Sequence, residues 1–196
     1  VKKAKSELIK FKPDVVIGFG GYISAPVIYA SSKLKIKTII HEQNSIPGVS
    51  NKFLSRYVDK ILVSFKESIN DFPKEKTVYT GNPRSEQIKD IEKISKTTLG
   101  FKKDKPLVII VMGSLGSLTM TEKLKEVLPL FKNKNYQVLL ITGKNYYDYY
   151  KDLKLSSNVK LIPFYNNLIG LMKDTDLIVT RSGASTIAEI TSIGLP

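Results

Sequence analysis

The side chains best suited to chemistry lie near the end of the chain, where a helix is expected to begin. The stretch Thr180-Arg181-Ser182-Gly183-Ala184-Ser185-Thr186-Ile187-Ala188-Glu189 follows an apolar run that reads as a short buried strand. A helix that begins after a strand presents free N–H groups and the positive end of its dipole, so it binds anions. Glu189, one to two turns further on, is placed to accept hydrogen bonds from a ribose diol. This stretch therefore indicates a nucleotide diphosphate site and an enzyme that uses a nucleotide-activated substrate.

Four further motifs follow short apolar segments in the same way. They are Gly20-Gly21-Tyr22, His41-Glu42-Gln43-Asn44, Gly81-Asn82-Pro83-Arg84 and Gly113-Ser114. In open parallel sheets, ligands bind outside the carboxyl ends of the strands. Because all five motifs fall at such ends, the sequence predicts a binding cleft between two α/β units.

Each motif also has a structural interpretation. Gly18-x-Gly20-Gly21 lacks the full dinucleotide-binding pattern and is equally typical of a tight turn between a strand and a helix. The glycines around Ser114 lack the Gly-Lys-Ser/Thr of a P-loop; they form either a phosphate cradle or a turn. His41 is either a general base or a residue that orients a loop. Arg84 is either an anchor for phosphate or substrate, or an ordinary surface arginine.

No metal site is predicted. The chain has no cysteine and a single histidine, so thiolate and multi-histidine sites are excluded. Asp174-Thr175-Asp176 imitates the Asp-x-Asp metal motif of some sugar transferases, but it lies between a helix end and a buried strand. Turn chemistry explains both carboxylates there.

Composition narrows the function less than the motifs do. The 196 residues are 42% hydrophobic and 25% charged, as in an ordinary globular protein, and the formal net charge is +13. Nucleic-acid binding, an anionic membrane surface and a lysine-rich source composition all explain this charge. The lysines are spread along the chain, which favours the compositional interpretation first and the membrane surface second. No segment approaches the roughly 20 apolar residues that span a bilayer.

Strands and helices alternate along the chain, which implies parallel sheets with helices on both faces. Residues 85–105 are charged, lack a continuous apolar run, and mark a boundary near residue 84 between two α/β units. The expected strands are 14–21, 37–40, 60–64, 78–80, 106–112, 136–142, 159–164 and 176–180. The expected helices are 1–12, 26–33, 49–58, 119–131, 145–153, 168–173 and one beginning near Ala184.

The order of the motifs is more specific than any one of them. It runs Gly20-Gly21-Tyr22-Ile23-Ser24-Ala25-Pro26, His41-Glu42-Gln43-Asn44-Ser45-Ile46-Pro47-Gly48, Gly81-Asn82-Pro83-Arg84, Gly113-Ser114-Leu115-Gly116, then Arg181-Ser182-Gly183-Ala184 with Glu189. This order resembles the MurG family across essentially the whole chain. These bacterial enzymes move N-acetylglucosamine from its UDP donor onto the C4 hydroxyl of undecaprenyl-pyrophosphoryl-N-acetylmuramoyl-pentapeptide, by an inverting displacement.

The resemblance implies a glycosyltransferase-B fold, in which two Rossmann-like domains face a cleft. Residues 1–84 then belong to the acceptor domain and residues 85–196 to most of the donor domain. It implies UDP-N-acetylglucosamine as co-substrate, no tightly bound cofactor, no nucleic-acid partner, and a peripheral position on the cytoplasmic face of the bacterial plasma membrane. The donor-binding positions that it implies are Asn44, Arg84, Ser114, Tyr165, Ala184, Ser185, Thr186, Ile187, Ala188 and Glu189.

On the acceptor side, the resemblance implies Gly20, Gly21 and Tyr22, together with His41 as a candidate catalytic residue. Leu115 stands where the family has a polar residue, so a side-chain contact there is in doubt. The family's first glycine-rich loop, with its candidate base, and a glutamine that reads the sugar have no match in these residues. We therefore expect a fragment with weak donor binding and little or no turnover. The alternatives are another glycosyltransferase-B enzyme with a lipid acceptor, or a non-catalytic module that binds nucleotides or nucleic acid.

Overall fold

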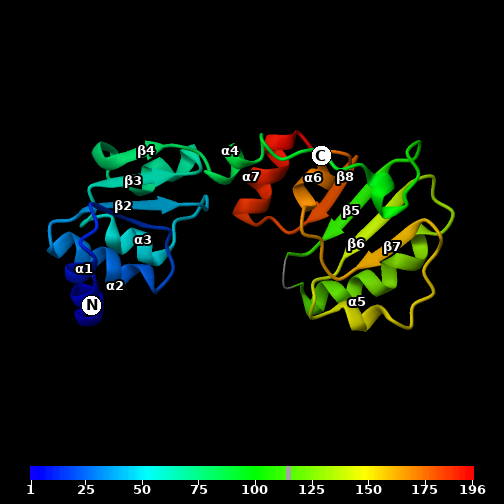
Figure 1. Cartoon of the computed structure of the whole chain (residues 1–196), viewed down its shortest axis with the longest axis horizontal. Helices are drawn as coiled ribbons and strands as arrows, with labels where there is room; N and C mark the ends of the chain where they lie inside the picture. The colour runs from blue at the N-terminus through cyan, green and yellow to red at the C-terminus, as the bar shows by residue number, and fades with distance from the viewer. Residues whose placement is uncertain (114–115) are drawn as a thin grey trace. The chain divides into compact units, whose positions relative to one another are not determined.

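The computed structural model divides the chain into two compact units, Val1–Pro83 and Arg84–Pro196. It describes residues 1–113 and 116–196. Each unit holds one sheet of four parallel strands, in the order β1-β2-β3-β4 and β7-β6-β5-β8 (Figure 1). The predicted class of two parallel-sheet α/β units is therefore confirmed.

The first unit forms a sheet with its helices on one side (Figure 1). Helix α2 packs so closely on β1 that a Cβ added to Gly18 would lie 2.7 Å from Ile28. Val15 and Ile17 point to the opposite face of β1 and stay 45% and 49% exposed, because α1 packs against α2. The elements are α1 (Lys2–Phe11), β1 (Val15–Gly18), α2 (Ser24–Lys33), β2 (Lys37–Glu42), α3 (Val49–Leu54), β3 (Lys60–Val63), η1 (Lys66–Asp71), η2 (Lys74–Lys76) and β4 (Thr77–Tyr79).

The second unit buries both faces of its sheet, and its central strands therefore read as continuous apolar runs. Ile109 and Val111 face a core shared with α6 and α7, while Ile110 faces a second core shared with α5. The elements are α4 (Arg84–Gln87), η3 (Lys96–Leu99), β5 (Leu107–Val111), α5 (Leu118–Val127), η4 (Leu128–Phe131), β6 (Gln137–Ile141), η5 (Tyr147–Tyr150), β7 (Val159–Ile162), α6 (Leu168–Met172), β8 (Leu177–Thr180) and α7 (Ala184–Ile193).

The helix predicted for the tyrosine-rich stretch does not form at its full length. The helix expected over 145–153 is the single 3-10 turn η5. Tyr150 is only 2% exposed, its hydroxyl donates to the carbonyl of Thr121, and burial raises its pKa. Tyr146 and Tyr149 pack ring against ring with centroids 5.7 Å apart. Packing of these rings in the core and at its rim therefore explains the stretch.

The charged segment before β5 is part of the second unit, where it forms a strap (residues 88–105). Phe101 lies in the core, and lysine ammonium groups bind the carbonyls of the strap. Lys173 donates to Ile88 at 3.0 Å, Lys96 to Lys105 at 2.8 Å, and Lys160 to Leu99 at 2.5 Å. Of these three lysines, only Lys96 belongs to the charged segment; Lys160 lies on β7 and Lys173 directly follows α6. All three hold the backbone of the strap in place.

Candidate functional site

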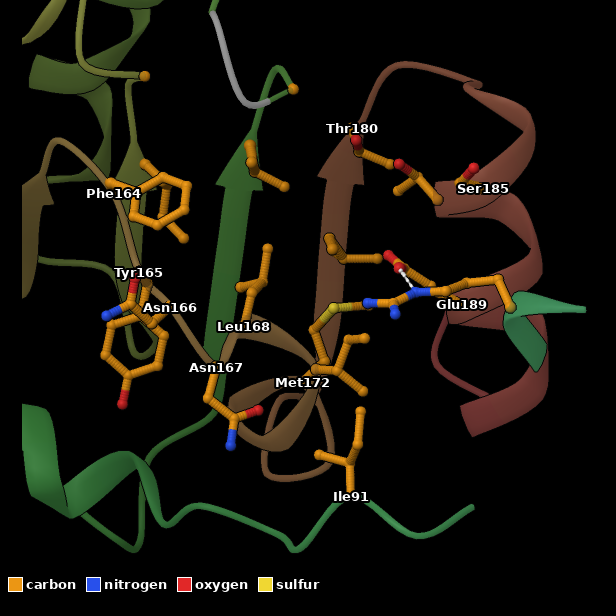
Figure 2. A pocket seen from close by; sticks show the side chains of 18 of the residues that line it. Ile91, Phe164, Tyr165, Asn166, Asn167, Leu168, Met172, Thr180, Ser185 and Glu189 are labelled. Atoms are coloured by element: carbon orange, nitrogen blue, oxygen red, sulfur yellow. Dashed lines mark hydrogen bonds and ion pairs between the residues drawn. The ribbon is translucent and has the colours of Figure 1, made fainter. Parts of the chain in front are cut away.

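A pocket of about 420 Å³ opens at the carboxyl ends of the strands of the second unit (Figure 2). Val111, Ile141 and Thr180, the last residues of β5, β6 and β8, line it. The other lining residues include Arg84, Gly113, Phe164, Tyr165, Asn166, Ser185, Thr186 and Glu189. The parallel sheet therefore brings together residues from distant parts of the sequence, as expected for this sheet edge.

The start of α7 is one wall of this pocket. Its N-cap, Gly183, has extended backbone angles, and no side chain in the described part of the protein caps the helix. The first turn holds no acidic residue, and the first intrahelical bond runs from the N–H of Ile187 to the carbonyl of Gly183. The N–H groups of Ser185 and Thr186 therefore lie in the turn whose donors have no intrahelical acceptor, which suits an anion.

Of the predicted α7 positions, only some line the pocket. Ser185, Thr186 and Glu189 do so, and they share one face of the helix. Ala184, Ile187 and Ala188 are half-buried on the same helix and are not among the lining residues. Glu189 binds Arg84 at 2.7 Å between Oε1 and Nε.

Aromatic and amide side chains follow β7 at the side of the pocket away from Glu189 (Figure 2). Tyr165 is one of the predicted donor-binding residues, while Phe164 and Asn166 are not among them. Phe164 is 43% exposed, and the Lys144 ammonium lies 5.2 Å from its ring centroid. An exposed aromatic ring beside a cation is a surface on which a base can stack. Its exposure at a strand end depends on the neighbouring loops, which the sequence pattern does not reveal.

Two glycines after β5, Gly113 and Gly116, lie close to neighbouring groups. Gly113 has a φ of +89°, and a Cβ there would lie 2.8 Å from the guanidinium of Arg181. Gly116 has a φ of +77°, and a Cβ there would lie 2.4 Å from the carbonyl oxygen of Thr142. The predicted donor residue Ser114 lies outside the described residues. Arg181 belongs to the predicted motif but not to the predicted donor-binding positions, and it adds a cation beside Gly113. Its place directly after β8 was the available signal.

In the first unit, the most constrained functional candidate is Glu42, which is 2% exposed. Its Oε1 accepts from the N–H and the side-chain amide of Asn44, and its Oε2 from the N–H of Gly48 and the amide of Asn51. Burial would raise the pKa of Glu42, but these four hydrogen bonds together hold it below its ordinary value. Glu42 thereby fixes the loop that carries Asn44, a predicted donor residue exposed on this unit.

His41 is 2% exposed, and both of its ring nitrogens have partners. Nε2 lies 3.1 Å from the carbonyl oxygen of Gly81, and Nδ1 lies 3.1 Å from the amide nitrogen of Gln43. That amide also donates to the carbonyl of His41 at 2.9 Å, which fixes its orientation. A carbonyl only accepts and an amide nitrogen only donates, so the pattern suits a neutral ring with its hydrogen on Nε2. This geometry favours the structural interpretation of His41, as a residue that orients a loop.

The predicted acceptor-side residues follow β1. Gly20 and Gly21 have φ values of +84° and +78°, and a Cβ on Gly20 would lie 3.3 Å from the amide of Asn51. Tyr22 is 84% exposed. A small pocket of about 240 Å³ adjoins this loop, lined also by Glu42 and Asn44. The glycine turn and the Glu42 loop therefore share one surface of the first unit.

The two aspartates of the Asp-x-Asp stretch accept hydrogen bonds from backbone N–H groups and form ion pairs with lysines. Asp176 accepts from the N–H of Leu107 at 2.8 Å, and Asp174 accepts from the N–H of Lys96 at 2.8 Å and pairs with Lys93 at 2.6 Å. Burial would raise the pKa of Asp174, but these contacts hold it below its ordinary value. Within residues 1–113 and 116–196, no group of three or more histidine or acidic side chains could hold a metal ion.

Two family models match the chain. The glycosyltransferase family 28 N-terminal domain matches residues 1–63, and the glycosyltransferase family 28 C-terminal domain matches residues 107–196. The fold and these matches define a glycosyltransferase scaffold. The chain belongs to glycosyltransferase family 28.

Several individual proteins are similar to this chain along its whole length. The UDP-N-acetylglucosamine–N-acetylmuramyl-(pentapeptide) pyrophosphoryl-undecaprenol N-acetylglucosamine transferases of Halalkalibacterium halodurans and Bacillus subtilis are 48% and 45% identical to it over its whole length. The chain spans 55% of the length of each relative. The crystal structure of Acinetobacter baumannii MurG matches 95% of this chain and 52% of its own, with 28% identity and a TM-score of 0.68. The predicted resemblance to the MurG family is confirmed.

A solved structure with less sequence likeness shares the fold. A putative UDP-N-acetylglucosamine 2-epimerase from Listeria monocytogenes matches 100% of this chain and 58% of its own, with a TM-score of 0.77 and 13% identity. Identity at this level shows the fold alone.

Proposed function

We propose that this chain contributes the donor site and part of the acceptor domain of an inverting N-acetylglucosamine transferase. The donor is UDP-N-acetylglucosamine, and the acceptor is the C4 hydroxyl of undecaprenyl-pyrophosphoryl-N-acetylmuramoyl-pentapeptide. The observation that carries the proposal is the pocket where the free first turn of α7, Glu189 and the exposed ring of Phe164 come together. The names of the two relatives supply the identity of the sugar and the acceptor.

Each part of the pocket suits one part of the donor. The diphosphate lies at the first turn of α7, where backbone N–H groups and the helix dipole stabilise the charge that develops as UDP leaves. The ribose hydroxyls donate to Glu189. The base lies against Phe164 and the backbone at Tyr165. Asn44 and Ser114 remain proposed donor contacts on the strength of the family resemblance, as does the diphosphate contact of Ala184, Ile187 and Ala188.

The first unit carries exposed apolar side chains and positive charge that suit a lipid surface. Apolar side chains follow the neighbouring strands β1 and β2: Tyr22, Ile23, Ile46 and Val49 are 84%, 66%, 80% and 87% exposed. Lysines crowd α1 of the same unit. Exposed apolar groups combined with positive charge suit the anionic surface of a membrane on which a lipid-linked acceptor resides. No helix in the described ranges is long and apolar enough to cross a bilayer. We place the protein at the cytoplasmic face of the plasma membrane, without a nucleic-acid partner.

The test is calorimetric titration with UDP-N-acetylglucosamine, with UDP-glucose, NADH and single-stranded RNA as comparison ligands. We expect the first ligand to bind best. Glu189→Gln should weaken it by about 10- to 100-fold, because hydrogen bonds to a carboxylate contribute about 1.5–3 kcal/mol. Glu126→Gln, which changes an exposed carboxylate on α5, is the matched control and should leave affinity unchanged. Preference for NADH, or RNA binding with a steep salt dependence, would contradict the proposal.

A further inference from the structure

The guanidinium of Arg84 is committed to a carboxylate of the pocket. Its Nε lies 2.7 Å from Oε1 of Glu189, and one terminal nitrogen lies 2.9 Å from Oε1 of Gln87 on the same short helix, α4. The side chain of Glu189 is 17% exposed and that of Arg84 is 42% exposed. The sequence alone leaves Arg84 as either an anchor for phosphate or substrate, or a surface arginine. In the structure, its guanidinium binds the side chains of Glu189 and Gln87.

The two carboxylate oxygens of Glu189 have different surroundings. Oε1 accepts from Arg84, and no residue that the structure describes donates to Oε2. Because the guanidinium fork is planar and rigid, a bond to Gln87 at one nitrogen fixes the direction of the bond to Glu189 at another. Glu189 is therefore held in one orientation, with its second oxygen left for a hydroxyl donor.

The position along α7 separates this pair from the expected anion site. Glu189 is four residues beyond Ser185, which corresponds to about 6 Å along a helix axis. Arg84 is thus bound at the level of Glu189, one turn away from the free N–H groups. A ligand whose diphosphate lies at the helix start has its ribose, and not its phosphates, beside this pair.

We propose that Arg84 is a positioning residue that acts through Glu189 on the ribose diol, with Gln87 holding Arg84 in place. The inference rests on the proposed function, because it assumes that a uridine nucleotide occupies this pocket. It assigns to Arg84 selectivity for ribose hydroxyls, and to Gln87 a supporting role in that selectivity. Binding of the diphosphate belongs to the start of α7.

The experiment measures affinities of the intact chain for three ligands: UDP, uridine and the 2′,3′-dideoxy analogue of UDP. The variants are Arg84→Gln, Glu189→Gln and the two combined, with Lys123→Gln on the surface of α5 as a control for charge. We expect Arg84→Gln to weaken UDP and uridine by a similar factor of about 10 and to leave the dideoxy analogue within about twofold. The double variant should bind UDP no more weakly than Glu189→Gln alone.

Two conservative variants separate positioning from simple charge. Arg84→Lys keeps the positive charge but loses the fork, so it should behave like Arg84→Gln toward UDP. Gln87→Leu should weaken UDP in the same direction by about threefold, and it too should spare the dideoxy analogue. Circular dichroism spectra that match those of the wild type show that each variant is folded.

A different pattern overturns the inference. If Arg84→Gln weakens UDP far more than uridine, weakens the dideoxy analogue equally, and is rescued by lysine, then Arg84 contacts phosphate directly. Additive effects of Arg84→Gln and Glu189→Gln would also refute it. In both cases the wild type still binds UDP, so the proposed function survives. If the wild type binds none of the three ligands, the proposed function fails and takes the inference with it.

Discussion

At the scale of single residues, Glu42 shows how a buried charge orders a loop. The chain reverses between β2 and α3, and the N–H groups of Asn44 and Gly48 both point to this carboxylate. Asn51 closes the arrangement from α3 and also donates to the carbonyl of His41 at 3.3 Å. A charged acceptor suits a site built only from donors, and a neutral amide does not.

Glu42→Gln should therefore destabilise the protein by roughly 1–3 kcal/mol at pH 7, because an amide places a donor against other donors. The pKa of Glu42 is lowered in the folded state, so its stabilising contribution is complete above the ordinary value of 4.5 and is lost as pH falls below that value. The difference in unfolding free energy between wild type and variant should thus shrink from pH 7 to about pH 3. Urea unfolding at several pH values measures it.

Glu67→Gln is the matched control, because Glu67 lies exposed on η1 of the same unit. Its effect should be within about 0.5 kcal/mol at every pH. A difference for Glu42→Gln that stays constant down to pH 3 would show that the hydrogen-bonded charge is not the source of the stabilisation.

Residue-level prediction succeeded where position along the chain was enough. The strand ends, the start of α7 and the place of Glu189 follow from local pattern, and Ser185, Thr186 and Glu189 do line one pocket. The partners of His41 and Arg84 could not be predicted, because they depend on which carbonyl or carboxylate the fold brings near. Gly81 is 40 residues from His41, and Glu189 is 105 residues from Arg84. The proposed contacts with a donor stay predictions.

At the scale of elements, the conformation of Gly116, between β5 and α5, depends on a close contact as well as on its backbone angles. Gly116→Ala meets two obstacles: a φ of +77° and the Thr142 carbonyl 2.4 Å away. Gly194 has a similar φ of +72° at the end of α7, but a Cβ there meets nothing within 4 Å. The two substitutions therefore separate backbone strain from crowding within one unit.

We expect Gly194→Ala to cost about 1–2 kcal/mol, the strain of a left-handed conformation, and Gly116→Ala to cost about 1–3 kcal/mol more. Because Gly116 lies against Thr142, the neighbour of the pocket residue Gly143, its substitution should also weaken UDP binding, while Gly194→Ala should not. Chemical unfolding and calorimetry measure the two effects. Equal costs at both positions would mean that the close contact between residue 116 and the Thr142 carbonyl does not contribute to the cost.

The pattern of elements was largely predictable, and the two segments whose structure the pattern does not reveal have a common cause. Strands β5, β6 and β8 are marked by apolar runs that both faces of a sheet demand. The tyrosine-rich turn η5 and the strap have no such period, because their order comes from single buried anchors such as Tyr150 and Phe101. Secondary-structure propensity alone does not reveal that one aromatic residue among charged neighbours is buried in the core.

At the scale of the whole molecule, charge is the main property that the sequence already supplies. A net charge of +13 attracts any anionic surface, and salt weakens that attraction. The exposed apolar side chains after β1 and β2 favour a membrane over other anionic partners, because they can insert among lipids. Two units with separate cores were also predictable, whereas the assignment of acceptor and donor roles to them stays a prediction.

We predict that the protein sediments with vesicles rich in phosphatidylglycerol at about 0.05 M salt, and is released at about 0.5 M. The double variant Ile46→Ser with Val49→Ser should weaken this binding about tenfold or more, because both side chains are at least 80% exposed and available to lipid. Leu130→Ser, at an exposed position of the second unit, is the control and should bind like wild type. Equal loss in both variants, or no binding at low salt, would contradict the membrane proposal.

The lysine-fastened strap decides where the polypeptide can be cut. A donor unit trimmed to begin at residue 106, where the apolar pattern resumes, would discard Phe101 from its core and leave Asp174 and Asp176 without the amine and N–H of Lys96. A unit that begins at residue 84 keeps these anchors. These hydrogen bonds also keep Lys96 buried, with only 7% of the residue exposed. Trypsin cleaves after lysine, so digestion of the folded protein should spare the peptide bond after Lys96, although the segment is rich in lysine.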